Sequence, residues 1–578
     1  MPLRIGPSPV FVVECVTSAR RWQMYALRTG VVVVLFFALW LGWNRVVGPR
    51  RGPMSYKDYA AVGEAFYFAV IGTQLALVLL AAPGAAAGAI CIDKLCGNLL
   101  HLFVTDLSDS EVVLGKLASR LAPVAGLIVV SLPVLMIASL LGGLNPEAVV
   151  AAYIVMAGTG LAGCALALLL SVWGRKPHEV LLVTYLVEVA WLMAYAVWLA
   201  ADVEVFHTGH AADWLKNLNP YILIYAPYAQ ARGVEWSDYG LFAAAAVLVA
   251  VVCTLLAVVT VRTCTLREGA VTAKPRRVTR KPRDVLLLDR DPVLWYERHR
   301  HRPSRWTRIA WRCFTFAAVG GSVLTVVALV RGHRVDGMAT VVNLLQAPIG
   351  VLFVLVGAVT ALADERIRGG LDVLLTTPVS SAAIVRAKWR AAVRPVPWLT
   401  ALPAAICVAT ALYQRSAEAW ILAMVVMCLS LAYGLFAASF GLLVATVVPR
   451  VGRAIGVAVG VFAVQCLGWP MMVRLLFETY GDEWIGLTLI SPIFGCGALT
   501  EFQFHRGVGD RFALCSVWGM IWVVLLLLAA GLCYALILAV FDRCLGRVPE
   551  GGAQWRDPAI RRSARYNSRT SPAAVESS

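Results

Sequence analysis

Long apolar runs recur from one end of this chain to the other, and they restrict its fold more than any other feature. Each run is about 20 residues, enough for one α-helix to cross the roughly 30 Å hydrocarbon core of a bilayer. Of the 578 residues, 60% are hydrophobic and only 15% are charged, whereas soluble domains carry about 25% charged residues. The mean hydropathy is +0.75. We therefore predict an all-α polytopic membrane protein.

The runs predict twelve transmembrane helices. They start near residues 26, 64, 121, 147, 179 and 239, and again near 308, 341, 396, 418, 454 and 514. With these spans, most of the 51 Lys and Arg residues lie in connecting segments on one side of the membrane. Because cytoplasmic loops are enriched in Lys and Arg, we assign that side to the cytoplasm. The first run lacks a signal-peptide cleavage site and is expected to remain as a span. We expect a plasma (inner) membrane protein with both termini cytoplasmic.

The formal net charge of +17 fits this topology without a nucleic-acid partner. The basic stretches at 276–283 and 561–562 are expected to lie beside the anionic cytoplasmic leaflet. The fourteen cysteines are scattered and include no C-x-x-C pair, which fits neither a disulfide framework nor a zinc site.

Comparison of the chain with itself indicates a duplication. Residues 93–116 and 365–388 have the same length, and seven positions are identical at one constant spacing. The matching pairs are Gly97/Gly369, Leu99/Leu371, Leu102/Leu374, Thr105/Thr377, Ser108/Ser380, Val113/Val385 and Lys116/Lys388. The same spacing relates Gln74 to Gln346 and Pro220 to Pro492. We predict two parallel six-helix repeats, at 1–263 and 291–545, joined by a basic linker at 264–290 and followed by a basic, disordered tail at 546–578.

Each repeat places its matched polar segment on the inside, between its second and third spans. In the first copy, Ser108 and Glu111 have capping-box spacing at the start of a helix. In the second copy, Thr377-Pro378 ends a helix and Ser380 caps the next one. Each segment is thus predicted to be a short helix, a break and a second helix that continues into the third span. An amphipathic helix lying on the membrane remains an alternative, whereas a matched pair favours a two-lobed cytoplasmic partner.

The second copy resembles the signature of type-2 ABC exporter permeases, which contains an acidic–basic pair, a glycine, Thr-Pro and a later lysine. The residues that carry the resemblance are Asp364, Glu365, Arg366, Gly369, Thr376, Thr377, Pro378, Ser380 and Lys388. The first copy carries a degenerate form of the pattern in Asp93, Lys94, Gly97, Thr105, Ser108, Glu111 and Lys116, with Asp106 at the proline position. In that family the segment is a coupling helix seated in a groove of the ATPase.

The stretch before the first span of each repeat is similar to the N-terminal connecting helix of the same family. Its residues are Pro9, Glu14, Arg21 and Trp22 in the first repeat, and Pro292, Glu297, Arg305 and Trp306 in the second. The resemblance implies a permease that forms the substrate path and couples to separate cytoplasmic ABC ATPase subunits, expected as a dimer.

The chain has no nucleotide site of its own by sequence. A phosphate-binding loop requires Gly-Lys followed by Ser or Thr, and the Gly115-Lys116 pair is followed by Leu117. We therefore expect no catalytic residue and no cofactor in this chain, with ATP and Mg²⁺ bound by the partner ATPase.

Polar residues within the spans are candidates for lining the path, because ionisable and amide groups are costly in a membrane. Glu188, Gln74 and Gln346 are the three candidates. Hydrogen bonds between helices explain the two glutamines equally well, and a helix-locking contact is the alternative for Glu188. Gly456 and Gly460 have the spacing of a helix-packing motif.

Two clusters of acidic or histidine residues contain possible metal ligands, but neither indicates a metal site. His207 and His210 lie near Asp202, Glu204 and Asp213 in an outer loop, where solvation is the simpler explanation. Asp289 and Asp291 match a metal-binding motif in letters only. No metal site is predicted.

Two other classes of protein remain as alternatives. A secondary transporter also has twelve spans in parallel repeats, but its second and third spans are usually joined by a short loop. A polytopic membrane enzyme would gather acids and histidines at one interface, and the sequence has no such set.

Overall fold

The structure is a computed structural model, which describes the greater part of the chain. The described residues are 8–20, 22–47, 55–139, 144–202, 213–229, 234–271, 293–295, 305–332, 336–367, 370–377, 379–449, 451–470, 472–473, 483–504 and 509–545. Within these residues every regular element is helical, as the composition predicted. Most of the linker and the whole tail, at 272–290 and 546–578, lie outside them.

The long helices follow the predicted spans closely. The first set is α2 (Trp22–Val47), α3 (Tyr56–Ala86), α6 (Asp109–Val130), α8 (Pro146–Trp173), α9 (Pro177–Ala201) and α12 (Trp236–Val271). The second set is α15 (Arg305–Val330), α16 (Asp336–Ile367), α19 (Val396–Gln414), α20 (Ala417–Val447), α21 (Val451–Ala463) and α25 (Gly509–Leu545). Among the described residues, eleven helices are long and apolar enough to cross a membrane, and α2 contributes a shorter apolar stretch at Arg28–Asn44.

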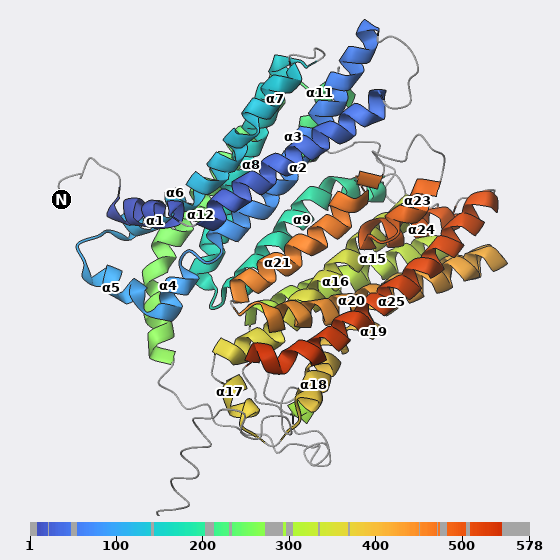
Figure 1. Ribbon diagram of the computed structural model, residues 1–578. Helices are drawn as coiled ribbons and strands as arrows, with labels where there is room; N and C mark the ends of the chain where they lie inside the picture. Colours follow the sequence, from blue (N-terminus) through green and yellow to red (C-terminus); the bar gives the residue numbers. More distant parts are fainter. Residues whose placement is uncertain are drawn as a thin grey trace, which may run out of the picture.

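Shorter helices lie at both ends of the bundle. At one end of the bundle lie α1 (Pro9–Ala19), α4 (Cys91–Cys96), α5 (Asn98–Val104), α17 (Gly370–Leu375) and α18 (Ser381–Val393). The remaining short helices are α7 (Leu132–Ser139), α10 (Asp213–Lys216), α11 (Pro220–Ala229), α23 (Glu483–Thr488) and α24 (Pro492–Phe504). Figure 1 shows α7, α11 and α23 at the opposite end of the bundle. We call the first end the predicted inner end.

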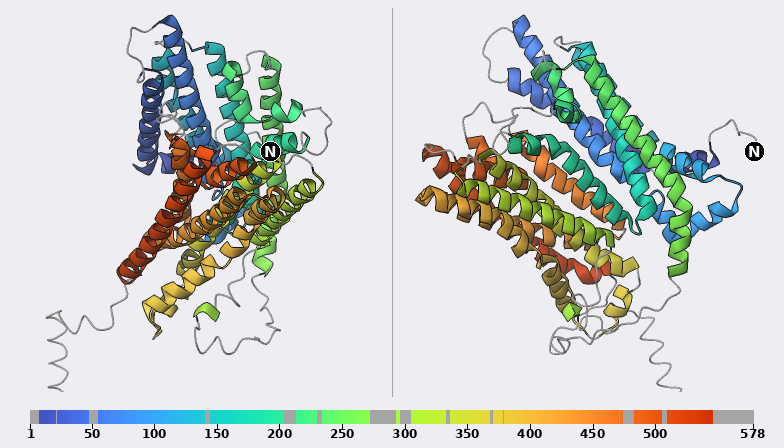
Figure 2. Two further views of the ribbon diagram at one scale, coloured as in Figure 1. Left: turned by 90° about the vertical axis from the view of Figure 1, so that its right-hand side faces the viewer. Right: turned by 180° about the vertical axis from the view of Figure 1, so that it is seen from behind.

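The two sets pack in the same pattern. In the first set α8 packs on α3, α6 and α12, and in the second set α20 packs on α16, α19 and α25. Each set has its own apolar core, which holds Tyr67 and Leu168 in the first and Tyr433 and Leu429 in the second. The two views of Figure 2 show the sets as neighbouring bundles of tilted helices. Helix α9 joins them, because it packs on α8 and α3 and also on α16, α15 and α21.

The short helices that precede the last spans, α10 and α11 in the first set and α23 and α24 in the second, also share a local contact. Asn219 and Ser491 stand directly before Pro220 and Pro492, the first residues of α11 and α24. Asn219 Oδ1 accepts from the Tyr221 amide at 3.0 Å, while its Nδ2 donates to the Leu192 carbonyl at 2.7 Å. Ser491 Oγ donates to the Cys466 carbonyl at 2.8 Å. Asn219 thus contacts α9, the fifth long helix of the first set, and Ser491 contacts the π-helical segment η2 (Val464–Gly468), which continues α21, the fifth long helix of the second set.

Candidate functional site

The first matched segment has the predicted helix–break–helix form. Helix α4 ends at Gly97, whose φ of 77° lies in the left-handed region that favours glycine. Helix α5 follows and stops at Thr105, which is extended. Ser108 then caps α6: its amide donates to Glu111 Oε2 at 2.8 Å, and the Glu111 amide donates to Ser108 Oγ at 3.3 Å. The predicted capping box is confirmed.

The second matched segment has the same form. Helix α17 ends at Leu375, and α18 begins after Ser380, whose Oγ accepts from the Ala383 amide at 3.3 Å. Ser380 is therefore the predicted cap, and the missing box follows from Ala383 at the position of Glu111. Gly369 and Pro378 lie outside the described residues.

An ion pair with a buried lysine closes each segment on itself. Lys388 Nζ lies 2.6 Å from Glu365 Oε2 and donates to the Ala361 carbonyl at 3.1 Å. At the matching positions, Lys116 Nζ pairs with Asp93 Oδ2. Both lysines are only 1% exposed. The pair joins the end of the second span to the helix that enters the third span, in both sets.

The basic residue that follows each of these acids donates a hydrogen bond near the end of the fourth long helix of its set. Lys94 Nζ donates to the Val172 carbonyl at 2.7 Å, near the end of α8. Arg366 Nη2 donates to the Thr446 carbonyl at 3.3 Å, near the end of α20. The last carbonyls of a helix lack intrahelical partners and favour cations. In both copies, the acidic residue and the basic residue after it thus make contacts within the chain.

The first segment has an additional anchor in α1. Glu14 Oε1 lies 2.7 Å from Lys116 Nζ, and Glu14 Oε2 lies 3.0 Å from Arg120 Nη2 and accepts from Ser119 Oγ at 2.8 Å. Partial burial acts to raise the pKa of Glu14, but Lys116 and Arg120 outweigh it and hold the pKa below its usual value. Ser8 Oγ also donates to the Glu111 carbonyl at 3.2 Å. Helix α1 is therefore docked on the start of α6.

Each segment leaves an apolar surface uncovered at the predicted inner end. Leu100 and Val104 of α5 are 51% and 87% exposed, and Val373 of α17 is 68% exposed. The predicted site residues Thr105, Ser108, Thr376 and Ser380 are exposed as well. Side chains of the segments thus divide into a buried set that pairs internally and an exposed set available to a partner. We call Leu100, Val104 and Val373 the exposed segment residues.

Several predicted residues lie outside the described part of the chain or have undescribed side chains. Arg21, Pro292 and Glu297 are outside it. The backbones of Trp22, Arg305, Trp306 and Asp364 lie in helices. Glu204, His207, His210, Asp289 and Asp291 are also outside it, and the described residues contain no group of three possible metal ligands.

The two glutamines of the second spans form hydrogen bonds between or along helices. Gln74 Nε2 donates to the Leu127 carbonyl at 2.7 Å. Gln346 Nε2 donates to Asn343 Oδ1 at 2.6 Å, and its Oε1 accepts from Ser322 at 3.2 Å. Asn343 in turn donates to Thr500 at 2.8 Å. These contacts fit the alternative explanation of the two glutamines, which is hydrogen bonding between helices. The third candidate, Glu188, is buried in α9.

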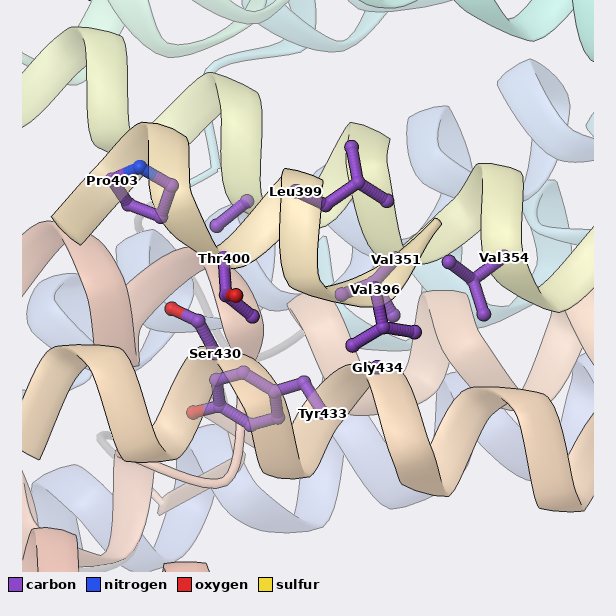
Figure 3. Close-up of a pocket in the computed structure, with 10 residues that line it drawn as sticks. Val351, Val354, Val396, Leu399, Thr400, Pro403, Ser430, Tyr433 and Gly434 are labelled. Carbon is purple, nitrogen blue, oxygen red and sulfur yellow. The ribbon is translucent and has the colours of Figure 1, made fainter. Parts of the chain in front are cut away.

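A narrow pocket lies between α16, α19 and α20, and Figure 3 shows its lining. Its polar atoms are the hydroxyls of Thr400, Ser430 and Tyr433. Thr400 donates to the Pro397 carbonyl at 2.9 Å, Ser430 donates to the Val426 carbonyl at 2.7 Å, and Tyr433 donates to the Leu489 carbonyl. The other lining groups are aliphatic side chains and a glycine.

Comparison with known proteins bears on the second set of helices. No curated protein sequence matches the chain significantly. A family model described as ABC-2 family transporter protein matches residues 316–543. This range runs from within α15 to the last turn of α25. The match supports an ABC-2 type permease, which is the membrane component of an ABC transporter.

Proposed function

We propose that this chain is the membrane subunit of an ATP-driven exporter, with separate cytoplasmic ATPase subunits docked on the two matched segments. The family match supports a permease, and the observation that carries the docking is the repeated geometry of the segments. Each has a buried lysine paired with a carboxylate, and exposed apolar side chains at the same end of the bundle.

Burial of the ion pairs suits them to transmit movement. A buried pair that loses one partner leaves an uncompensated charge, which costs about 3–5 kcal/mol. Glu365 and Lys388 therefore keep α18 fixed to the end of α16. Pressure of a partner on the segment moves the second and third spans together. In this proposal the paired residues position the coupling surface, and the exposed segment residues make the contact.

We further propose that both sets of helices act as fused permease units. The shared element order, the shared packing of α8 and α20, and the matching ion pairs support this. One chain then supplies both membrane halves, and two ATPase subunits are expected per chain. The path runs between the two sets, and cargo leaves the cytoplasm.

Reconstitution tests the proposal. The full chain is purified with the ABC ATPase that accompanies it and placed in lipid nanodiscs, where ATP hydrolysis is compared with that of the ATPase alone. Val104→Glu and Val373→Glu place a charge within the exposed segment residues, and each is expected to lower stimulation several-fold. The Val373 variant is expected to have the larger effect, because the first copy of the signature is degenerate.

Cys544→Glu is the matched control. Cys544 is exposed near the end of α25, so it adds the same charge at the same end of the bundle but outside both segments. Full stimulation by this control with loss in the two segment variants supports docking. Full stimulation by all three variants contradicts it. Transport driven by an ion gradient without nucleotide would favour the secondary transporter instead.

A further inference from the structure

Helix α9 crosses from one apolar core to the other. Near its start, Val180, Leu181 and Leu182 are buried in the core of the second set. Farther along, Trp191 and Leu192 pack on the core of the first set. Glu188 lies between these two stretches. A change in how the two sets pack against each other therefore alters the surroundings of Glu188 first.

Glu188 is a largely buried acid for which the described part of the chain shows no ion pair and no hydrogen bond. The residue is 7% exposed, and none of the ion pairs or hydrogen bonds found there includes it. An unpaired carboxylate is costly in apolar surroundings, so such a group is neutralised by a proton instead.

The two titratable groups nearest Glu188 point their hydrogens elsewhere. Tyr185 and Cys164 are close enough to interact electrostatically with the carboxyl. The Tyr185 hydroxyl donates to the Leu80 carbonyl at 2.8 Å, however, and the Cys164 thiol donates to the Ala82 carbonyl at 3.6 Å. Neither hydrogen is available to stabilise a carboxylate.

The described side chains of α15, α16 and α21, three helices of the second set that pack on α9, add no compensating charge. Residues that α15, α16 and α21 give to the shared core are aliphatic or aromatic. Among the described side chains of these helices, Arg308, Arg312 and Arg453 are exposed, and Glu365 and Arg366 are engaged at the predicted inner end.

Glycine and proline shape the space that holds the carboxyl. A Cβ at position 163 would lie 2.9 Å from Glu188 Oε1, so glycine there leaves room for the acid. The same Cβ would lie 3.3 Å from Ala82 and 3.9 Å from Pro83 Cδ, which places α3 against the same space. Pro83 lies inside α3 and has no amide hydrogen. The site is thus fitted to a carboxyl and offers it no donor.

We propose that Glu188 is a proton-binding site whose occupancy is linked to the packing of the two sets of helices. The proton is bound while the sets are packed as in this structure. Separation of the sets along α9 admits water, and the acid then releases the proton to that water as an ordinary carboxylate. By linkage, low pH favours the packed arrangement and high pH favours the separated one. This inference goes beyond the proposed function and does not require an ATPase.

Infrared spectroscopy of the purified full chain in nanodiscs tests the site directly. The wild-type chain at neutral pH is expected to show a carbonyl band of a protonated carboxyl group. Glu188→Gln keeps the shape of the side chain and is expected to remove this band, whereas Glu147→Gln, at an exposed carboxyl near the start of α8, is expected to retain it. A neutral-pH spectrum without a band assignable to Glu188 overturns the proposal.

Exchange into heavy water tests the linkage. The band is expected to shift slowly in the wild-type chain, because Glu188 is only 7% exposed in the packed arrangement and becomes open to water when the sets separate. Leu181→Ala removes packing between α9 and the second core and is expected to speed the shift several-fold, whereas Val197→Ala, at an exposed position of α9, is expected to leave the rate unchanged. Equal rates in all three chains contradict the linkage. The two proposals can fail separately. If the chain binds no ABC ATPase but shows the Glu188 band, the proposed function is refuted and the proton site is supported.

Discussion

Ser381 Oγ donates a hydrogen bond of 2.5 Å to Asp542 Oδ1, which joins the start of α18 to the end of the last span, α25. Farther along α18, Trp389 Nε1 donates to Ser439 at 2.9 Å, and its ring packs edge-on against Tyr534. The second segment is therefore anchored to α20 and α25, whereas the first is anchored to α1 through Glu14. Among the described residues, the two copies share their ion pair, and the contacts seen to brace it come from different helices.

This difference predicts that Ser381→Ala weakens coupling in the second set. Loss of a hydrogen bond to a charged group costs about 1.5–3 kcal/mol, so α18 is held less firmly against α25. We expect lower ATPase stimulation with unchanged membrane insertion, because Ser381 lies at the end of the bundle. ATP hydrolysis in nanodiscs, normalised to the amount of chain, measures this. Ser380→Ala, which removes only the helix cap, separates a cap effect from a brace effect; equal losses in both would contradict the brace.

Lys388→Met is expected to destabilise the chain strongly, by about 3–5 kcal/mol, because it leaves Glu365 buried without its cation. The double variant Glu365→Gln with Lys388→Met removes both charges and is expected to recover most of the loss. Thermal unfolding of the purified variants measures the coupling energy through a double-mutant cycle. Additive effects of the two substitutions would show that the pair is not a unit.

The local structure of the segments could be predicted from the sequence, because caps depend on residues three positions apart. Ser108 with Glu111 and Ser380 with Ala383 follow that rule. The spans were predictable for a similar reason, since length and apolarity decide them. How α9 divides its packing between two cores was not predictable, because its apolar residues carry no mark of the core they enter.

The internal pairing of Glu365 with Lys388 was missed by the sequence analysis, which assigned both residues to the coupling surface. Their coupling role stays a prediction, now as positioning residues. A usable signal was present: an acid and a lysine recur at the same separation in both copies, as Asp93 with Lys116 and Glu365 with Lys388. Opposite charges repeated in this way indicate a mutual contact, but only a fold that returns the chain on itself brings them together.

Docking of α1 is predicted to depend on pH through Glu14. Its pKa is lowered in the docked state by Lys116 and Arg120, so its contribution is fully present above the ordinary Glu value of about 4.3. That contribution is lost as the pH falls through the lowered pKa, when Glu14 becomes neutral. Hydrogen exchange of the amides at 9–19 is expected to accelerate in this acidic range. Glu14→Gln is expected to exchange fast at every pH; protection equal to the wild type in that variant would contradict the docking.

The distribution of Lys and Arg predicts the orientation of the chain. Reporter fusions at residues 210, 275 and 560 are expected to read outside, inside and inside, because basic segments are retained in the cytoplasm. The 210 fusion is the control for the other two, since it lies in a loop of the opposite side. An exterior signal from the fusion at 275 is incompatible with twelve spans and a cytoplasmic linker.

The most direct measurement of the central claim is site-specific photo-crosslinking in native membranes. A photoreactive amino acid replaces Val104 or Val373, and the captured proteins are identified by mass spectrometry; the same residue at Val330, an exposed position near the end of α15 away from both segments, serves as control. Our account predicts that an ABC ATPase is captured at both segment positions and not at 330. Capture of no ABC ATPase at either segment, in membranes where the chain is present at its normal level, would contradict it.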